Sequence, residues 1–280
     1  MAKGGRNLGA AIAVGVPLVV LVVLTLMFWN PGLIILLVLF TSLGVVEVHD
    51  ALRRMGLNAC VPPIIICNVL TIGGAYVAAL FQNSTHIPWH VVLMGCLGLS
   101  VMLSLVWRMF YGTEDFAKDA AASLFIVAYV SLLASFIGLI LAMDDGALKL
   151  TVVFLGVVAS DTGGYALGAT LGKHQLAPVI SPKKTWEGVL GSFLLSAATM
   201  VVMCVFFTGW AWWYGFVIAA VCVVFGTAGD LVESMIKRDA GLKDMSSILP
   251  GHGGVMDRLD SILFAAPAGW FLLSLPIPLA

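Results

Sequence analysis

Two pairs of acidic residues in this sequence are spaced to share one face of a helix. Asp230 and Glu233 are three residues apart, and so are Asp257 and Asp260. Residues at i and i+3 of an α-helix project from the same face. Like charges this close repel unless a cation lies between them, and carboxylate oxygens suit Mg²⁺. The spacing therefore predicts a metal site. The alternative is a structural ion-pair network with the basic neighbours Lys237, Arg238 and Arg258.

A glycine-rich turn, Pro250 to Gly254, lies between the two acidic pairs. Its glycines allow backbone amides to approach a ligand closely. We expect the next helix to begin near Val255, and amides at a helix start can hold phosphate oxygens. Gly253 and Gly254 are therefore candidate substrate-binding positions. A zinc site at His252 is not favoured, because no cysteine or second histidine lies nearby in the sequence.

A second polar segment runs from Pro178 to Gly188 and contains Ser181, Lys183 and Lys184. Its prolines favour an extended backbone. The two lysines have two compatible interpretations. They attract anionic lipid, at about 1 kcal/mol for each basic residue near the membrane surface, or they clamp the phosphate of a nucleotide or a phospholipid headgroup.

The elements that carry these residues belong to a membrane protein. The chain has 280 residues, of which 61% are hydrophobic and 10% charged, whereas soluble domains carry roughly 25% charged residues. No basic tail or patch indicates nucleic-acid binding. The five cysteines form no CxxC pair and lie mostly in apolar runs, where they are expected to be buried, small apolar residues.

A bilayer core requires roughly 20 apolar residues per helix. The sequence predicts an all-α polytopic fold with nine such spans, at about 8–29, 32–49, 61–82, 88–108, 120–142, 148–170, 188–208, 211–232 and 256–279. The first is longer than the roughly 7–15 apolar residues of a signal peptide, so we interpret it as an uncleaved span.

The basic residues predict how the spans are oriented. With the N-terminus in the cytoplasm, 13 of the 14 Lys and Arg residues lie on the cytoplasmic side, including Lys3 and Arg6, and only Lys149 lies opposite. The C-terminus is then outside, and the polar loops 171–187 and 233–255 face the cytoplasm at the cell membrane. Glu47 and Asp50 end the second span, where we expect ion pairs with Arg53 and Arg54.

The 27 residues from Ser234 to Asp260 resemble the signature of the phosphatidate cytidylyltransferase (CDP-diacylglycerol synthase) family. They read Ser-Met-Ile-Lys-Arg, then Lys243-Asp244, then Pro-Gly-His-Gly-Gly-Val-Met-Asp-Arg-Leu-Asp. The flanking Gly229 to Ser234, and Ser181 to Gly188, agree with it. Asp161-Thr-Gly-Gly-Tyr165 resembles the family's sixth-span motif, with Thr162 and Gly163 as variations. The resemblance covers about 155–270.

The resemblance implies that CTP and phosphatidic acid give CDP-diacylglycerol and pyrophosphate, with Mg²⁺ required. It leaves open a second metal or a monovalent cation, and also the oligomeric state, a homodimer included. The implied metal ligands are Asp230, Glu233, Asp257 and Asp260. The implied catalytic residues, whose basic members neutralise the nucleotide phosphates, are Lys237, Arg238, Lys243, Asp244, His252 and Arg258. The implied substrate-binding residues are Ser181, Lys183, Lys184, Thr185, Glu187, Asp161, Tyr165, Gly253 and Gly254.

This interpretation divides the chain into residues 1–150, which form spans one to five for lipid access and packing, and residues 151–280, the catalytic region. Two other functions compete. A CTP-dependent polyprenol kinase, or a cytidylyltransferase for another lipid phosphate, shares much of the chemistry. An ion-coupled transporter also needs intramembrane carboxylates, but transporters tend to show repeated halves, and here the polar residues gather in one third of the chain.

Overall fold

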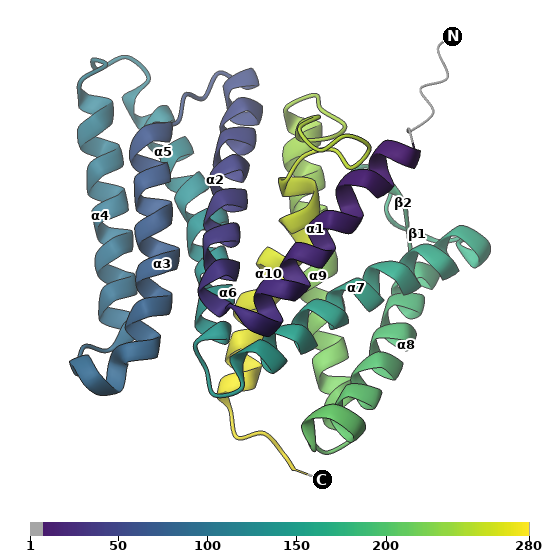
Figure 1. Ribbon diagram of the computed structural model, residues 1–280. Coiled ribbons are helices and arrows are strands. Elements are labelled where there is room, and N and C mark those ends of the chain that lie inside the picture. The colour runs from purple at the N-terminus through teal and green to yellow at the C-terminus, as the bar shows by residue number, and fades with distance from the viewer. Residues whose placement is uncertain (1–7, 280) are drawn as a thin grey trace. The chain divides into compact units, whose positions relative to one another are not determined.

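The computed structural model describes residues 8–279, which are almost entirely helical (Figure 1). The N-terminal helices are α1 (Leu8–Phe28), α2 (Asn30–Arg54), α3 (Val61–Thr85), α4 (Trp89–Met109) and α5 (Phe116–Ile126). A π-helical segment, η1 (Val127–Leu132), joins α5 to α6 (Leu133–Leu141). The remaining helices are α7 (Gly146–Leu171), α8 (Trp186–Met203) with the π-helical end η2 (Cys204–Thr208), α9 (Tyr214–Asp239) and α10 (Met256–Ser274).

Seven helical stretches of the described residues are long and apolar enough to cross a membrane: Asn30–Arg54, Val61–Ser84, Trp89–Met109, Phe116–Leu141, Gly146–Leu171, Trp186–Thr208 and Tyr214–Asp239. The prediction of a polytopic, all-α membrane protein is therefore confirmed. Each of the nine predicted segments coincides with a helix or a run of joined helices, although α1 and α10 fall outside these seven. Lys3 and Arg6, on which the orientation partly rests, lie outside the described residues.

Local sequence explains where several helices begin. Proline stands in the first turn of α2 and of α3, where its missing N–H costs no helical hydrogen bond. Helix α8 begins after Thr185, whose hydroxyl accepts a hydrogen bond from Gly188 N at 3.1 Å. A threonine N-cap of this kind satisfies one of the amides that the first turn leaves free.

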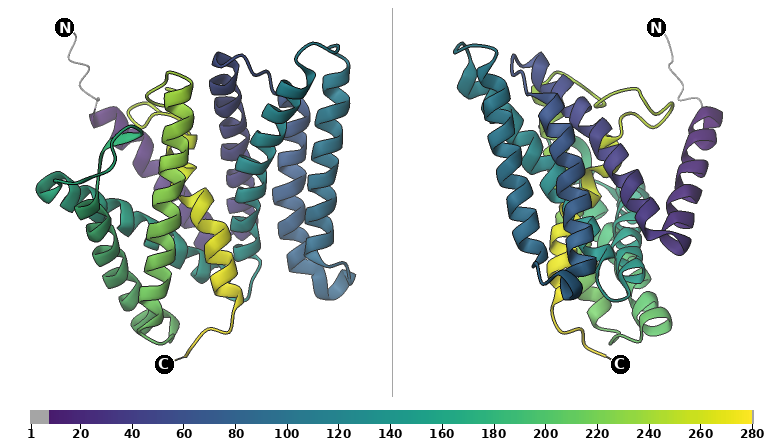
Figure 2. Two further views of the ribbon diagram at one scale, coloured as in Figure 1. Left: turned by 180° about the vertical axis from the view of Figure 1, so that it is seen from behind. Right: turned by 60° about the vertical axis from the view of Figure 1, so that its left-hand side comes forward.

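The chain divides into two compact units. Unit 1 comprises Met1–Gly138 and Asp239–Leu259, and unit 2 comprises Leu139–Arg238 and Asp260–Ala280. In unit 1, helices α2, α3 and α4 run side by side in both views of Figure 2, and α5 packs against α2 and α4. Fully buried Val45, Ile64, Ile72 and Ile126 form part of its core. Most of the signature, from Asp239 to Leu259, thus belongs to the same unit as the N-terminal helices.

In unit 2, helices α7 and α8 cross with their backbones in contact. A Cβ atom added to Gly163 would lie 2.3 Å from Gly191 O, and one added to Gly191 would lie 2.5 Å from Gly163 O. The hydroxyl of Ser192 donates to Ser160 O at 2.7 Å, and that of Ser196 donates to Gly156 O at 3.0 Å. Small residues that let backbones approach, with hydroxyl groups bonding across them, are typical of helix pairs in membranes.

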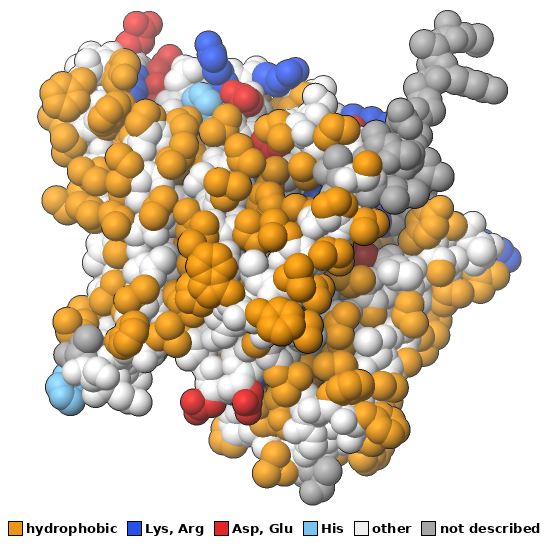
Figure 3. Space-filling view, in the orientation of Figure 1, with side chains coloured by type: hydrophobic (Ala, Val, Ile, Leu, Met, Phe, Trp, Pro, Cys, Tyr) orange, Lys and Arg blue, Asp and Glu red, His pale blue; other side chains and the backbone are white. Residues whose placement is uncertain are grey.

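The loop between α7 and α8 forms a small antiparallel sheet, of β1 (Gln175–Ala177) and β2 (Ser181–Thr185). Gln175 pairs with Thr185, and Ala177 pairs with Ser181. The extended backbone predicted for this loop is therefore confirmed at β2. Hydrophobic side chains are widespread on the face shown in Figure 3.

Candidate active site

A polar cavity of about 320 Å³ lies in unit 2. Strand β2 and the start of α8 form one side of it, and α7 and α9 contribute the rest. Its lining residues are Asp161, Gly164, Tyr165, Ser181, Lys183, Lys184, Thr185, Gly188, Val189, Ser192, Thr227 and Asp230. The structure thus brings together six of the nine predicted substrate-binding residues and one predicted metal ligand.

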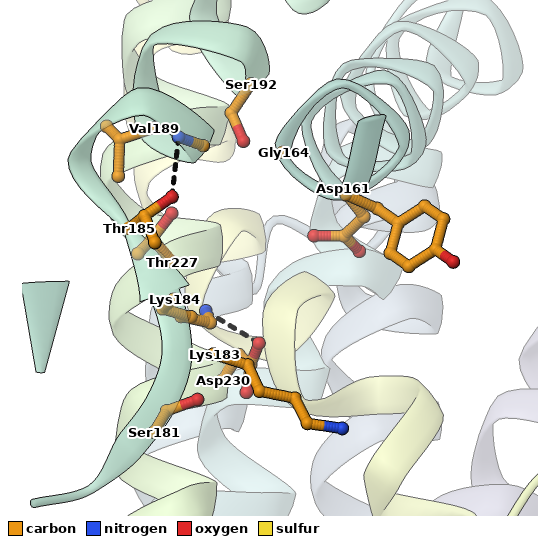
Figure 4. Close-up of a pocket in the computed structure, with 12 residues that line it drawn as sticks. Asp161, Gly164, Ser181, Lys183, Lys184, Thr185, Val189, Ser192, Thr227 and Asp230 are labelled. Carbon is orange, nitrogen blue, oxygen red and sulfur yellow. Dashed lines mark hydrogen bonds and ion pairs between the residues drawn. The ribbon is translucent and has the colours of Figure 1, made fainter. Parts of the chain in front are cut away.

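Opposite charges meet inside this cavity. Lys184 Nζ lies 2.6 Å from Asp230 Oδ2, and both side chains are partly exposed. In Figure 4 the carboxylate of Asp161 points from α7 toward the wall that carries Lys184 and Asp230. Lys183 and Tyr165 are exposed at the cavity. The cavity therefore offers both a cationic group for phosphate oxygens and carboxylate oxygens for a cation.

The geometry of the cavity depends on the helix crossing above it. A Cβ atom at Gly164 would lie 2.5 Å from Ser192 Oγ, so a glycine is needed for α7 to approach α8 at this level. Thr185 ends β2 and caps α8, which fixes the direction in which Lys183 and Lys184 leave the strand. Glu187 follows in the first turn of α8, where its carboxylate accepts hydrogen bonds from Lys173 N and His174 N. Glu187 therefore links the start of α8 to the residues just before β1.

Helices α9 and α10 approach each other beside Asp230. A Cβ atom at Gly229 would lie 2.3 Å from Asp260 O. The backbone of Asp260, near the start of α10, therefore packs against the part of α9 that carries Asp230. Carboxylates such as those of Asp230 and Asp161, which line the cavity, suit a hard cation such as Mg²⁺. Across residues 8–279, however, no group of three His, Cys, Asp or Glu side chains is arranged to hold a metal.

Glu233, one turn beyond Asp230, is fully buried and paired with Lys237 Nζ at 2.5 Å. Helix α9 continues past the predicted end of this span, near residue 232, and extends to Asp239, so Lys237 shares the helix with Glu233. The ion-pair alternative to the metal site is thus realised at this position. The neighbouring Arg238 donates from Nε to Ile180 O, just before β2, so it ties the end of α9 to the lysine-bearing loop.

In unit 1, residues 240–255 form the loop between α9 and α10, called the signature loop below, and its backbone bonds to the carboxylate of Asp257. Asp257, in the first turn of α10, is buried, and its Oδ2 accepts hydrogen bonds from Met245 N at 2.9 Å and Gly254 N at 2.7 Å. A carboxylate that bonds backbone amides at the start of a helix satisfies donors that would otherwise be unpaired. In this arrangement Asp257 shapes the loop that precedes it.

The structure places Glu47 differently from the prediction. We expected ion pairs at the end of the second span, but the Glu47 carboxylate is 2% exposed and contacts the signature loop. Its Oε1 accepts from Val255 N at 2.9 Å and from Ser246 Oγ at 2.5 Å, and its Oε2 accepts from Met256 N at 2.8 Å. The interfacial ion pair is therefore wrong for Glu47, because two orphan amides at the start of α10 offer it a buried partner.

The remaining signature residues are distributed along the same loop. Lys243, Asp244 and Arg258 are exposed, and His252 is half-buried. The amides of Gly254, Val255 and Met256, which lie where the sequence predicted phosphate binding, donate to carboxylates of the chain. Gly253 has φ +85°, a backbone conformation that favours glycine. This glycine is required by the shape of the turn.

Comparison with known proteins identifies the family of this chain. The sequence profile of the cytidylyltransferase family matches residues 9–275. The chain belongs to the cytidylyltransferase family. It is 38% identical to a phosphatidate cytidylyltransferase of Mycobacterium leprae, over 98% of this chain and 89% of that protein. It is 34% identical to the one of Mycobacterium bovis, over 98% and 90%, and 43% identical over 150 residues to the one of Staphylococcus saprophyticus, over 53% and 57%.

Membership of this family makes the chain a nucleotidyltransferase and confirms the family resemblance of the signature. Sequence reasoning missed several residues that the structure places at this enzyme's polar features. Thr227 lines the cavity three residues before Asp230 on α9, so the i,i+3 rule could have found it. Ser192 follows Gly188 by one helical turn. Glu47 gave no such signal, because its partners lie about 200 residues away in the sequence.

Proposed function

We propose that the chain transfers a cytidylyl group from CTP to phosphatidic acid, producing CDP-diacylglycerol and pyrophosphate. A phosphate oxygen of phosphatidic acid attacks the α-phosphorus of CTP. The new P–O bond forms as the bond to the β-phosphate oxygen breaks, and pyrophosphate leaves. The observation that carries the proposal is the cavity in which Lys184 and Asp230 meet, in a chain whose relatives are named for this reaction.

The proposed chemistry needs charge neutralisation more than a strong base. The phosphate of phosphatidic acid is already anionic near neutral pH, so the barrier lies in bringing two polyanions together and in stabilising the leaving pyrophosphate. Lys184 and the exposed Lys183 supply positive charge within the cavity. The cavity is lined by residues of the apolar helices α7, α8 and α9, which suits a lipid substrate whose acyl chains remain in the membrane.

We also propose Mg²⁺ as the cofactor. Asp230 and Asp161 line the cavity, so their carboxylates would hold the ion together with substrate phosphates, since the described residues form no complete metal site by themselves. Asp257 and Glu233, included in the ligand set by the resemblance, are engaged with backbone amides and with Lys237 respectively. When bound, Mg²⁺ would neutralise phosphate charge.

The proposed topology has nine spans, with the N-terminus and the polar loops in the cytoplasm and the C-terminus outside. The distribution of 13 of the 14 basic residues supports it. Fusing an activity reporter after Lys149 and, separately, after Lys243 tests it. We expect the two positions to report opposite sides of the membrane, and the same side for both would contradict the topology.

The activity test uses the purified protein, phosphatidic acid and CTP labelled at the α-phosphate. We expect label in the lipid product together with one pyrophosphate for each lipid formed. Label in released CDP, with transfer of the γ-phosphate to the lipid, would instead indicate a kinase. The matched variants are Asp230→Asn, in the cavity, and Asp239→Asn, exposed at the end of the same helix. Equal turnover in the two would remove the cavity from the proposal.

A further inference from the structure

The Glu47 carboxylate is a buried charge whose partners all lie in the signature loop. It is 2% exposed and accepts three hydrogen bonds, from Val255 N, Met256 N and Ser246 Oγ. Removing a carboxylate from water is costly unless it is well hydrogen-bonded. Three short donors, two of them amides at the start of α10, supply that compensation. Glu47 is therefore an integral part of the loop's structure, although it belongs to a membrane helix near the other end of the chain.

The backbone of the loop also lies close to the Glu47 carboxylate at Gly254. A Cβ atom at Gly254 would lie 2.8 Å from Glu47 Oε2 and 2.9 Å from Oε1. Gly44, one turn earlier on α2, similarly leaves space for the Met256 side chain, whose Sδ would be 2.7 Å from a Cβ there. Met256 is fully buried. Helix α2 and the start of α10 are thus fitted to each other by a hydrogen-bonded charge and by side-chain packing.

Two carboxylates divide the work of ordering this loop. Asp257 takes the amides of Met245 and Gly254, and Glu47 takes the next two amides, those of Val255 and Met256. The hydroxyl of Ser246, at the other end of the loop, also donates to Glu47 Oε1. Because both ends of the loop bond to Glu47, this one side chain closes the turn from 246 to 256 around Pro250–Gly254.

We propose that Glu47 is a positioning residue for the nucleotidyl transfer, which holds the signature loop in the conformation that the reaction requires. The proposal rests on the proposed function, because the family resemblance implies catalytic roles for residues of this loop, Lys243, Asp244 and His252. In this role Glu47 acts through the loop residues that it bonds, Ser246, Val255 and Met256. Spans one to five then contribute to catalysis by supplying this anchor, in addition to packing.

The test compares wild type with Glu47→Gln in the purified full-length protein. The variant keeps the side chain's size and one acceptor oxygen, but sets an NH₂ group against an amide donor. We expect faster hydrogen–deuterium exchange in the segment 245–258 and unchanged exchange in α7 and α8. We also expect kcat to fall by about tenfold or more, since misplacement of reacting groups by about 1 Å costs up to 10²-fold. Asp50→Asn, exposed on the same helix, is the control and should match wild type in both measurements.

If Glu47 only stabilised the start of α10, Glu47→Gln would lower the melting temperature of the protein without lowering the kcat of the folded enzyme. Wild-type kcat in Glu47→Gln, or a lower kcat with unchanged exchange in 245–258, would therefore overturn the proposal. If Glu47→Gln does not fold, Ser246→Ala decides, because it removes the hydroxyl donor and leaves both amide bonds. It should show a smaller rise in loop exchange with a severalfold lower kcat, and an unchanged kcat with faster exchange would contradict the role.

The two proposals fail in different ways. If wild type makes no CDP-diacylglycerol from CTP and phosphatidic acid, the proposed reaction is overturned. The exchange measurement needs no substrate, so unchanged exchange of segment 245–258 in Glu47→Gln would overturn the anchoring role whatever reaction the enzyme catalyses.

Discussion

The cavity in unit 2 and the signature loop in unit 1 use acidic residues in opposite ways. In the cavity, Asp161 is exposed and Asp230 is partly exposed beside a lysine. In the loop, Glu47 and Asp257 are buried, and their oxygens accept hydrogen bonds from backbone amides. Accessible carboxylates remain available to a ligand, whereas the buried carboxylates already accept hydrogen bonds from the chain itself. A signature rich in acids is therefore not in itself a set of metal ligands.

The largest effect is expected from the cavity. Asp230→Asn should lower turnover by about 10²-fold or more, the scale seen when a preorganised electrostatic contact is removed from an active site. Its pairing with Lys184 is partly exposed, so the free energy of unfolding should change by only about 0–1 kcal/mol. Turnover and thermal unfolding, measured on the same preparation, check the expected loss of activity and the expected small change in stability. A large loss of stability would mean that Asp230, like Asp257, mainly stabilises the fold.

The loop should respond in the opposite way. Asp257→Asn weakens two hydrogen bonds to a charged acceptor and should destabilise the folded protein by about 1.5–3 kcal/mol, measured by thermal or denaturant unfolding in detergent. A Mg²⁺ titration of turnover in the folded variant separates the two roles. Unchanged stability with a shifted Mg²⁺ dependence would return Asp257 to the metal ligands and would break the comparison.

The wall of the cavity should be sensitive to added volume. Gly163→Ala places a Cβ atom where it would lie 2.3 Å from Gly191 O, and overpacking of this kind costs about 1–3 kcal/mol. Gly98→Ala, on α4, meets nothing within 4 Å and should instead stabilise the helix by roughly 0.5–1 kcal/mol. Unfolding measurements on the two variants are expected to move in opposite directions. Equal shifts would mean that the α7–α8 contact tolerates separation.

The smallest effect is expected at an exposed cation. Lys183→Ala should raise the apparent KM for one substrate roughly fivefold, corresponding to about 1 kcal/mol per basic residue near an anionic surface. Lys173, exposed at the start of the same loop and absent from the cavity lining, provides the control. If both variants behave alike, the loop lysines attract lipid generally and do not clamp a phosphate.

Much of the fold could be predicted because a membrane helix is recognisable from one continuous apolar stretch of sequence. The spans follow from apolar length, and the grouping of Asp161 with Ser181 to Thr185 follows from motif resemblance. The i,i+3 rule correctly placed Asp230 and Glu233 on one helix, but it could not tell that Lys237 would neutralise the second of them. Burial decides between ligand and structural acid, and burial depends on packing that no local pattern encodes.

Glu47 illustrates that limit most clearly. Its position near the end of α2, close to Asp50, Arg53 and Arg54, suggested an interfacial acid. Only the tertiary structure reveals donors 208 and 209 positions later in the chain. The same separation makes the glycine at 254 appear to be a ligand-approach glycine, whereas a Cβ atom there would collide with Glu47. Contacts of this range are set by topology, and a single sequence carries no spacing rule for them.

The long separation between Glu47 and its partners also bears on how the protein is made. During synthesis, α2 emerges early, yet the amides that complete its acidic end follow only after some two hundred further residues. Contacts between such distant segments form late because the intervening chain must first be ordered. Until then, α2 carries a carboxylate without its native donors. A chain that stopped at Arg238 would therefore leave the Glu47 carboxylate of α2 without any of its three hydrogen-bond donors.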